Sequence, residues 1–289
     1  MLGLAVAHPV TYLQAVVLGL LQGVTELFPV SSLGHSVLFP TLFGWHGVVR
    51  SQSDPESFWL AFVVMLHVGS ALGLLAYFRR DWARIVRALL HTLRTRRVET
   101  PTERLAWLIV AASIPTGLLG LALEHPARVA LAKPALAAAF LVVNGAVLIV
   151  AQRLRRRAAA RPIAALTTGQ AALVGVAQAA ALVPGISRDG VCMAAGLRLG
   201  LDEQDAARFA FLLATPIILA AGLFKLPDLT GPLGDGVRGP AAVAAACAAL
   251  AAVASTALLV RWFERRNLVP FGIYCIAFGL AMCAYVAAT

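Results

Sequence analysis

The chain has 289 residues, of which 60% are hydrophobic and only 13% are charged. A soluble domain of this length carries roughly 25% charged residues, so the composition excludes an ordinary soluble protein. The net charge of +10 does not indicate nucleic-acid binding, because the basic residues lie in separate segments between apolar runs and not on one clustered face.

Six apolar segments predict membrane-spanning helices, because each is about long enough to cross a hydrocarbon layer of ~30 Å. In chain order they are 58–78, 105–123, 135–150, 209–223, 241–260 and 271–288. Six spans leave little room for a separate soluble domain. We therefore expect an all-α polytopic fold and a single membrane domain over residues 1–289.

The basic residues alternate between the segments that join these spans. Segments 79–104, 153–161 and 261–266 hold eight, five and three Lys or Arg, whereas segments 42–57, 124–133 and 225–239 together hold five. The positive-inside rule therefore predicts that the first set is cytoplasmic, near anionic head groups. Counting spans then predicts that both termini lie outside. No cationic segment precedes the first apolar stretch, so we expect no cleaved signal peptide.

Two further apolar segments, about 10–43 and 163–199, are interrupted by proline and polar residues at their centres. Their length fits a helix–turn–helix that enters and leaves the membrane by the same face. Irregular backbone at membrane depth is tolerated only where it is buried in protein or lines a wet cavity. We therefore expect two re-entrant hairpins, the first opening outside and the second inside.

The two hairpins resemble each other, since each has Gly, a Gln three residues later, and then Pro, Ser and Gly. The match runs from Gly19 to Gly34 and from Gly175 to Gly190, with one residue of slippage. Two halves of opposite orientation form an inverted repeat, which places broken helices at the membrane midplane around one site. We expect an interleaved inverted repeat of about 1–152 and 162–289.

The first hairpin carries the reactive side chains. Gln22 and Glu26 lie on one helical face, and Ser31, Ser32 and His35 follow the break, with Gly34 between them. An ionisable residue inside a membrane segment marks a functional site by default. Three structural alternatives remain open: Glu26 bonded to a neighbouring helix, one of the two serines as a helix N-cap, and His35 as a core histidine.

The second hairpin carries Ser187 and Arg188 after Pro184 and Gly185, with Gly190 close behind. An Arg at membrane depth must find an anion, and its planar fork suits phosphate oxygens. A helix that starts near Ser187 directs its positive end to the same point. An internal Arg188–Glu26 ion pair is the alternative, and both hold if substrate opens the pair. The four cysteines, Cys192, Cys247, Cys275 and Cys283, indicate buried free thiols.

The two hairpin sequences resemble the signature motifs of the undecaprenyl-pyrophosphate phosphatase family, also called bacitracin-resistance proteins. The resemblance rests on Gln22-Gly-Val-Thr-Glu26-Leu-Phe-Pro-Val-Ser-Ser32-Leu-Gly-His35 and on Pro184-Gly-Ile-Ser187-Arg188. Further similarity lies in Ile114-Pro-Thr-Gly, Phe209-Ala-Phe-Leu-Leu-Ala-Thr-Pro216 and Phe271-Gly-Ile-Tyr274, so it covers nearly the whole chain.

The resemblance implies a bacterial inner-membrane enzyme that converts the C55 isoprenyl pyrophosphate to the monophosphate carrier lipid of wall synthesis. It also implies a pocket open to the periplasm, a divalent cation (Mg²⁺ or Ca²⁺) and a homodimer. Its implied catalytic residues are Glu26, Ser32, His35 and Arg188, and Gln22 with Glu26 would hold the metal. The implied substrate-binding residues are Gln22, Ser31, Gly34, Gly185, Ser187, Asp189 and Gly190. The nucleophile is Ser32 or His35; we favour Ser32, with His35 as base or proton donor.

Three places depart from the family pattern. Asp189 and Cys192 stand where the family has Ser and Thr, His67 replaces a Gln, and Cys275 replaces an Arg. The lost Arg removes a cation, and Asp189 adds a negative charge beside the phosphate site. A different functional class also fits part of the pattern, because inverted repeats and broken helices are typical of carriers of prenyl phosphate or other anions. A carrier needs no nucleophile, so Ser32 and His35 favour the enzyme.

Overall fold

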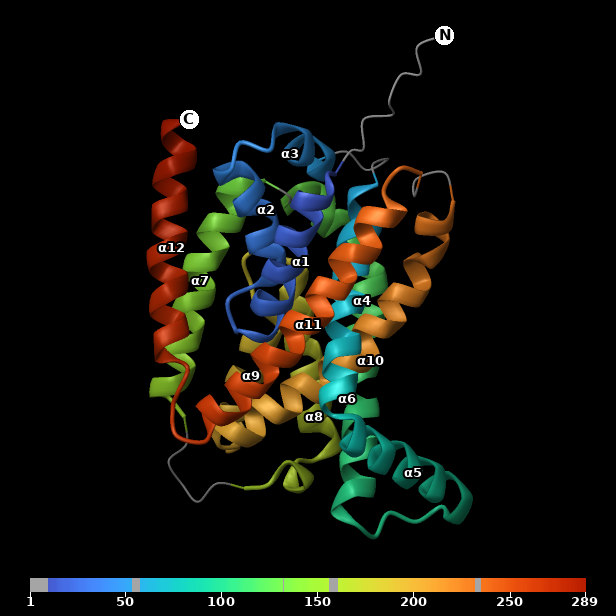
Figure 1. Cartoon of the computed structure of the whole chain (residues 1–289). Coiled ribbons are helices and arrows are strands. Elements are labelled where there is room, and N and C mark those ends of the chain that lie inside the picture. The colour runs from blue at the N-terminus through green and yellow to red at the C-terminus, as the bar shows by residue number, and fades with distance from the viewer. Residues whose placement is uncertain (1–9, 54–57, 132, 156–160, 232–234) are drawn as a thin grey trace.

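The fold is a bundle of helices, described by a computed structural model over residues 10–53, 58–131, 133–155, 161–231 and 235–289. Over these ranges the regular structure is helical throughout, with no strand. Most helices run between the two ends of the molecule, and the C-terminus lies at the end opposite α5 (Figure 1). The expected all-α fold is confirmed.

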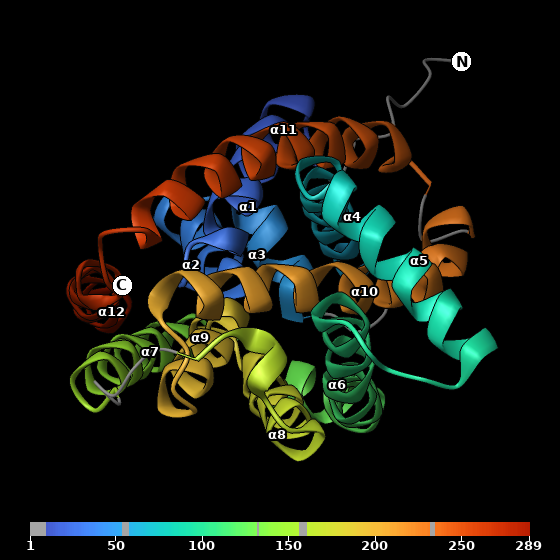
Figure 2. The ribbon, with the colours of Figure 1, turned by 90° about the horizontal axis from the view of Figure 1, so that it is seen from below.

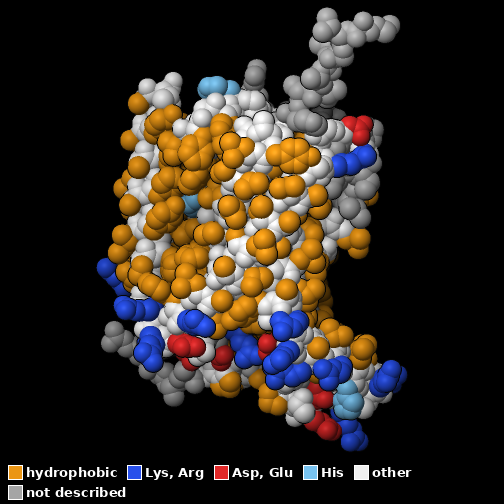
Figure 3. Space-filling view, viewed as in Figure 1, with side chains coloured by type: hydrophobic (Ala, Val, Ile, Leu, Met, Phe, Trp, Pro, Cys, Tyr) orange, Lys and Arg blue, Asp and Glu red, His pale blue; other side chains and the backbone are white. Residues whose placement is uncertain are grey.

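Five helices of the described residues are long and apolar enough to span a membrane. They are α6 (Pro101–Leu131), α7 (Pro134–Arg153), α10 (Glu203–Thr230), α11 (Arg238–Phe263) and α12 (Val269–Ala288). A sixth is α4 (Trp59–Tyr77), if it is counted with the bent helix that follows it. On the face drawn in Figure 3, apolar side chains cover a broad band of the bundle, and most of the visible Lys and Arg gather at one end.

Helix α5 (Arg79–Thr95) is a feature that the sequence interpretation did not contain, because its many arginines marked it as a connecting segment. Apolar residues nevertheless recur every three or four positions, which is the pattern of an amphipathic helix. The helix turns 85° away from α4 and projects sideways at the arginine-rich end (Figures 1 and 2). A short helix, α3 (His46–Ser53), lies at the other end.

Both predicted hairpins are confirmed as broken helix pairs. The first consists of α1 (Tyr12–Leu27) and α2 (Ser32–Leu42). In the second, short 3₁₀ turns at Ile163–Ala165 and Ala179–Leu182 flank α8 (Thr168–Gln178), and α9 (Arg188–Arg198) follows. The hairpins enter from opposite ends of the bundle (Figure 1), and their turns meet where the backbone N–H of Gly185 donates to Ser31 Oγ at 3.1 Å.

The two hairpins begin with the same device. Thr11 with Gln14, and Thr167 with Gln170, each form a capping box that satisfies backbone N–H groups at the start of α1 and α8. The second arms also begin alike, because Ser31 Oγ accepts from Gly34 N and Ser187 Oγ accepts from Gly190 N. In this register the one-residue slip falls at the prolines, and Ser31, rather than Ser32, corresponds to Ser187.

Glycines allow each hairpin to lie against a distant helix. A Cβ on Gly19 would lie 2.3 Å from the carbonyl oxygen of Ala244 in α11, and a Cβ on Gly175 would lie 2.0 Å from that of Ala112 in α6. Small residues permit such backbone contact between membrane helices. Helix α1 therefore packs on α11 and α8 on α6, which holds both turns in the middle of the bundle.

Candidate active site

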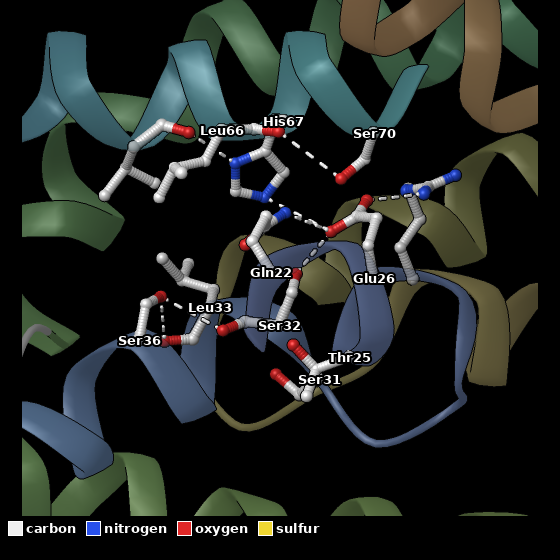
Figure 4. Close-up of polar contacts among 12 residues, drawn as sticks. Gln22, Thr25, Glu26, Ser31, Ser32, Leu33, Ser36, Leu66, His67 and Ser70 are labelled. Carbon is white, nitrogen blue, oxygen red and sulfur yellow. Dashed lines mark hydrogen bonds and ion pairs between the residues drawn. The ribbon is translucent and has the colours of Figure 1, made fainter. Parts of the chain in front are cut away.

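Glu26 is the centre of the site, at the last turn of α1 and 6% exposed. Its Oε2 accepts hydrogen bonds from Ser32 Oγ and from Gln22 Nε2, the latter at 2.9 Å. His67 Nε2 of α4 lies 3.4 Å from the same oxygen. These side chains all point at one carboxylate (Figure 4). The break after Leu27 makes this possible, because the chain reverses and brings Ser32 back beside Glu26.

Arg188 reaches the same carboxylate from the second hairpin. Its Nη2 lies 2.7 Å from Glu26 Oε1, and its Nη1 lies 3.0 Å from Asp189 Oδ1. The Glu26–Arg188 ion pair, which the sequence left as the alternative to phosphate binding, is thus present. It joins two hairpins 162 residues apart in sequence, and both side chains are largely buried. Removing one partner of such a pair typically costs about 3–5 kcal/mol, because the other charge is left buried and alone.

Asp189 is fully buried, yet its two carboxylate oxygens receive no well-aligned hydrogen bond from any described residue. The 3.0 Å approach of Arg188 Nη1 is therefore a charge contact without hydrogen-bond geometry. A buried carboxylate without donors is costly. Because Asp189 contacts Arg188, its negative charge weakens the attraction of Arg188 for an incoming anion.

Ser31 has a structural task that differs from that of Ser32. Its φ of 70° places it in the left-handed region, and its hydroxyl oxygen accepts from Gly34 N at 3.2 Å and Gly185 N at 3.1 Å. It therefore caps α2 and joins the two turns at once. Of the two serines, Ser31 is the N-cap, which leaves Ser32 to face Glu26, while Ser31 lies away from it in Figure 4.

Asn144 is a site residue that the sequence interpretation missed. It is fully buried in α7, its Nδ2 donates to Pro29 O at 3.0 Å, and its Oδ1 accepts from Ser187 N at 2.9 Å. One amide side chain thus holds the turn of each hairpin. An asparagine alone in an apolar run carries no motif; its only signal is a polar group where the membrane allows few.

His35 is fully buried on the other face of α2. Its Nδ1 lies 2.8 Å from the carbonyl oxygen of Ser31, and its Nε2 lies 2.8 Å from the hydroxyl of Tyr274. The ring stacks with those of Phe39, Tyr274 and Phe278. Because Nδ1 faces a carbonyl it donates, so Nε2 accepts from Tyr274. Within the described residues, no hydrogen bond joins His35 to Glu26, Ser32 or Arg188.

Among the described residues, Gln22 and Glu26 place adjoining side-chain oxygens at the centre of the site, and these could hold a cation. Gln22 Oε1 is buried without a hydrogen-bond partner, directly beside the Glu26 carboxylate. Among the described residues, no group of three or more His, Cys, Asp or Glu side chains is placed to hold a metal ion. Two oxygens fit Mg²⁺, which commonly takes one or two protein ligands and completes its shell with water and substrate phosphates.

The predicted site residues therefore divide into three groups. Glu26, Ser32, Gln22 and Arg188 converge, and Ser187 and Gly190 form the cap of α9 beside them. Ser31, Gly34 and Gly185 build the contact between the turns. His35 stands apart. The four cysteines are free thiols as predicted; Cys192 and Cys275 are buried, whereas Cys247 and Cys283 are only half-buried, so the prediction of burial was wrong for these two.

Fold and site together define a polytopic helical membrane protein in which two broken hairpins bring a carboxylate, a hydroxyl and an arginine to one buried point. The family model of the Bacitracin resistance protein BacA matches residues 15–281, and the chain belongs to this family. The match covers the second hairpin completely, the first hairpin from residue 15 onward, and every residue of the site.

Curated relatives extend over almost the whole chain. "Undecaprenyl-diphosphatase 2" of Frankia alni is 48% identical, over 96% of this chain and 98% of its own length. "Undecaprenyl-diphosphatase" of Mycolicibacterium paratuberculosis is 48% identical, over 97% and 99%. "Undecaprenyl-diphosphatase 2" of Chromobacterium violaceum is 42% identical, over 93% and 96%. The recognised family resemblance is confirmed.

Proposed function

We propose that this multi-pass membrane protein is an undecaprenyl-diphosphatase, which hydrolyses undecaprenyl pyrophosphate to the monophosphate carrier lipid. The observation that carries this proposal is the hydrogen bond from Ser32 Oγ to a carboxylate that is also paired with Arg188. A hydroxyl, a base and a phosphate-binding cation therefore lie within reach of one phosphoryl group. A carrier would need only the phosphate-binding Arg188, without the hydroxyl and the base.

In the proposed reaction Ser32 Oγ attacks the terminal phosphorus while Glu26 takes up its proton. A bond forms between Ser32 Oγ and phosphorus, and the bond from phosphorus to the bridging oxygen breaks, so prenyl monophosphate leaves. The departing prenyl monophosphate takes the proton from Glu26, so Glu26 can next deprotonate a water molecule. The water oxygen bonds to phosphorus, the bond from phosphorus to Ser32 Oγ breaks, Ser32 recovers a proton from Glu26, and inorganic phosphate leaves. Arg188 turns from Glu26 to the phosphoryl oxygens, where it stabilises their charge together with the backbone N–H groups at the start of α9.

Gln22 and Glu26 are the residues that we propose to hold a divalent cation, Mg²⁺ or Ca²⁺. The unpartnered Gln22 Oε1 supports this assignment. Held by these two residues, the cation would neutralise negative charge on the pyrophosphate. We expect a chelator to abolish phosphate release and Mg²⁺ or Ca²⁺ to restore it. Gln22→Ala should raise the cation concentration needed for half-maximal activity; an unchanged requirement would remove Gln22 from the metal site.

The proposed orientation puts the arginine-rich end, with α5, in the cytoplasm and the C-terminus in the periplasm. The asymmetry of Lys and Arg between the two ends supports this orientation (Figure 3). In this frame the first hairpin opens toward the periplasm, and we propose that substrate enters from that side. A homodimer, and repeat units of about 1–152 and 162–289, remain predictions.

The decisive experiment measures phosphate release from farnesyl and undecaprenyl pyrophosphates by the purified protein. Ser32→Ala, Glu26→Ala and Arg188→Ala should each lower kcat on the order of 10²–10³-fold or more. Thr41→Val is the matched control, since it removes a hydroxyl of the same helix that lies nine residues beyond Ser32 and donates to Val37 O. Rapid acid quenching separates the nucleophiles, because phosphoserine survives acid and phosphohistidine does not. Retained lipid-phosphate binding without release by the wild-type protein would favour the carrier.

A further inference from the structure

Helix α5 presents an apolar strip that the rest of the protein does not cover. Ile85 and Thr92 are buried against the bundle, and the Thr92 hydroxyl accepts from Trp107 Nε1 of α6 at 2.9 Å. On the adjoining side of the helix, Val86, Leu90 and Leu93 are 48%, 50% and 56% exposed. The first side fixes the helix, so the exposed strip has a constant orientation relative to the spans.

A row of arginines borders this strip. Arg80, Arg87 and Arg94 are seven residues apart and exposed. Residues seven apart lie about 20° from one another around a helix, so the three side chains form one line along its length. The only acid within α5 is Asp81, and its carboxylate already accepts from Arg84 at 2.8 Å and Arg208 at 2.7 Å. Within the part of the chain that the structure describes, no acid forms an ion pair with Arg80, Arg87 or Arg94, so the row keeps its positive charge.

The direction of α5 fits a membrane surface. Because it makes an angle of 85° with the spanning helix α4, its axis lies close to the membrane plane if α4 lies close to the normal. It also projects from the bundle at the end where Lys and Arg gather (Figures 2 and 3). An apolar strip beside a line of arginines in that plane is the pattern of an interfacial helix, whose arginines extend to the lipid phosphates.

We propose that α5 is an anionic-lipid-binding helix, with Val86, Leu90 and Leu93 inserted at the head-group boundary and Arg80, Arg87 and Arg94 bound to phospholipid phosphates. Helix α5 follows directly on α4, and α4 also carries His67, which contacts Glu26. The lipid contact rests on the geometry of α5 alone and does not depend on the proposed phosphatase activity.

Hydrogen exchange of the α5 amides in nanodiscs tests the proposal with the intact protein. Exchange over residues 82–94 should be on the order of tenfold slower in discs that contain phosphatidylglycerol than in pure phosphatidylcholine discs. The difference should vanish in 1 M salt, where the Debye length falls to about 3 Å. The triple variant Arg80→Gln, Arg87→Gln, Arg94→Gln should lose it.

The matched control removes three arginines from the same end of the molecule, Arg261→Gln, Arg265→Gln and Arg266→Gln, and should keep the full difference. Leu90→Gln should speed exchange in both lipids; Leu93→Gln gives the same test if the first variant does not fold. Equal exchange in both lipids, or a difference that survives the triple variant, overturns the proposal. Slow exchange of α5 in pure phosphatidylcholine that appears only in discs with two copies of the protein also overturns the proposal. In that case a second chain, and not lipid, covers the apolar strip.

Discussion

At the scale of single residues, the site depends on side chains that each serve both hairpins. Glu26 receives Ser32 from its own hairpin and Arg188 from the other. Ser31 accepts one backbone N–H from each turn, and Asn144 bonds one backbone group of each. A movement of either hairpin therefore separates the hydroxyl, the carboxylate and the guanidinium together.

Asn144→Leu tests how tightly the turns must be held. The substitution leaves Ser187 N–H without its acceptor, at a cost of about 1–3 kcal/mol, and leaves Pro29 O with the weak thiol donor of Cys275 at 3.9 Å. Because a misplacement of about 1 Å can cost 10²-fold in rate, we expect kcat to fall by about that factor. Thermal unfolding and steady-state kinetics measure the two effects. Asn144→Asp keeps the acceptor for Ser187 N–H, and equal kcat values for both variants and wild type would contradict the role.

Asp189→Ser tests the charge that opposes Arg188. It removes a buried carboxylate that lacks hydrogen-bond donors and frees the guanidinium for phosphate. We expect a KM several-fold lower, on the order of fivefold, and a melting temperature that is unchanged or higher. Kinetics with farnesyl pyrophosphate and a melting curve provide the check. A higher KM would mean that Asp189 orients Arg188 productively.

Sequence predicted best the residues whose charge is unfavourable inside a membrane unless it is paired. Glu26 and Arg188 are such residues, and in the structure they form an ion pair with each other. His35 has an equally polar side chain, yet its two nitrogens are occupied by Ser31 O and Tyr274, which no local pattern could reveal because Tyr274 is 239 residues away. Its predicted part in catalysis stays a prediction.

At the scale of elements, glycines decide where the hairpins pack. Gly175→Ala would bring a Cβ to 2.0 Å from Ala112 O, so α8 and α6 must move apart. We expect a loss of about 1–3 kcal/mol in unfolding free energy, as for other overpacked positions. Gly169→Ala in the same helix is the control, because nothing lies within 4 Å of its Cβ, and it should be neutral or stabilising by up to ~1 kcal/mol. Unfolding curves of the two variants give the comparison.

Prolines predicted the breaks within the two hairpins, although Pro40 lies inside α2 and Pro216 and Pro227 lie inside α10 without ending either helix. The break after Leu27 precedes Pro29, and α9 begins after the Pro184-Gly185 pair. Helix α5 was not predicted because its charged residues were taken to indicate a loop, although apolar residues recur in it at helical spacing. The exact correspondence of the serines escaped because the prolines are offset by one position, which only the shared caps of Ser31 and Ser187 reveal.

At the scale of the whole molecule, the orientation follows from the separation of charge between the two ends. Single cysteines introduced at Gly44 and at Thr95 lie at opposite ends of the bundle. In intact spheroplasts we expect a membrane-impermeant thiol reagent to label position 44 and to label position 95 only after lysis. The parent protein, with its four native cysteines, supplies the background. Labelling of position 95 in intact cells would reverse the proposed orientation.

The packing of α1 on α11 sets the order of events during synthesis. More than two hundred residues separate the end of α1 from the start of α11, so roughly 10–40 s pass between their emergence at 5–20 residues per second. Through that interval Glu26 lacks Arg188 for most of the time and α1 lacks its main neighbour. A chain stopped before α11 should therefore be inactive and a target for membrane proteases. The cell therefore contains no active incomplete phosphatase, because activity arrives only with α11, which begins in about the last fifth of the polypeptide.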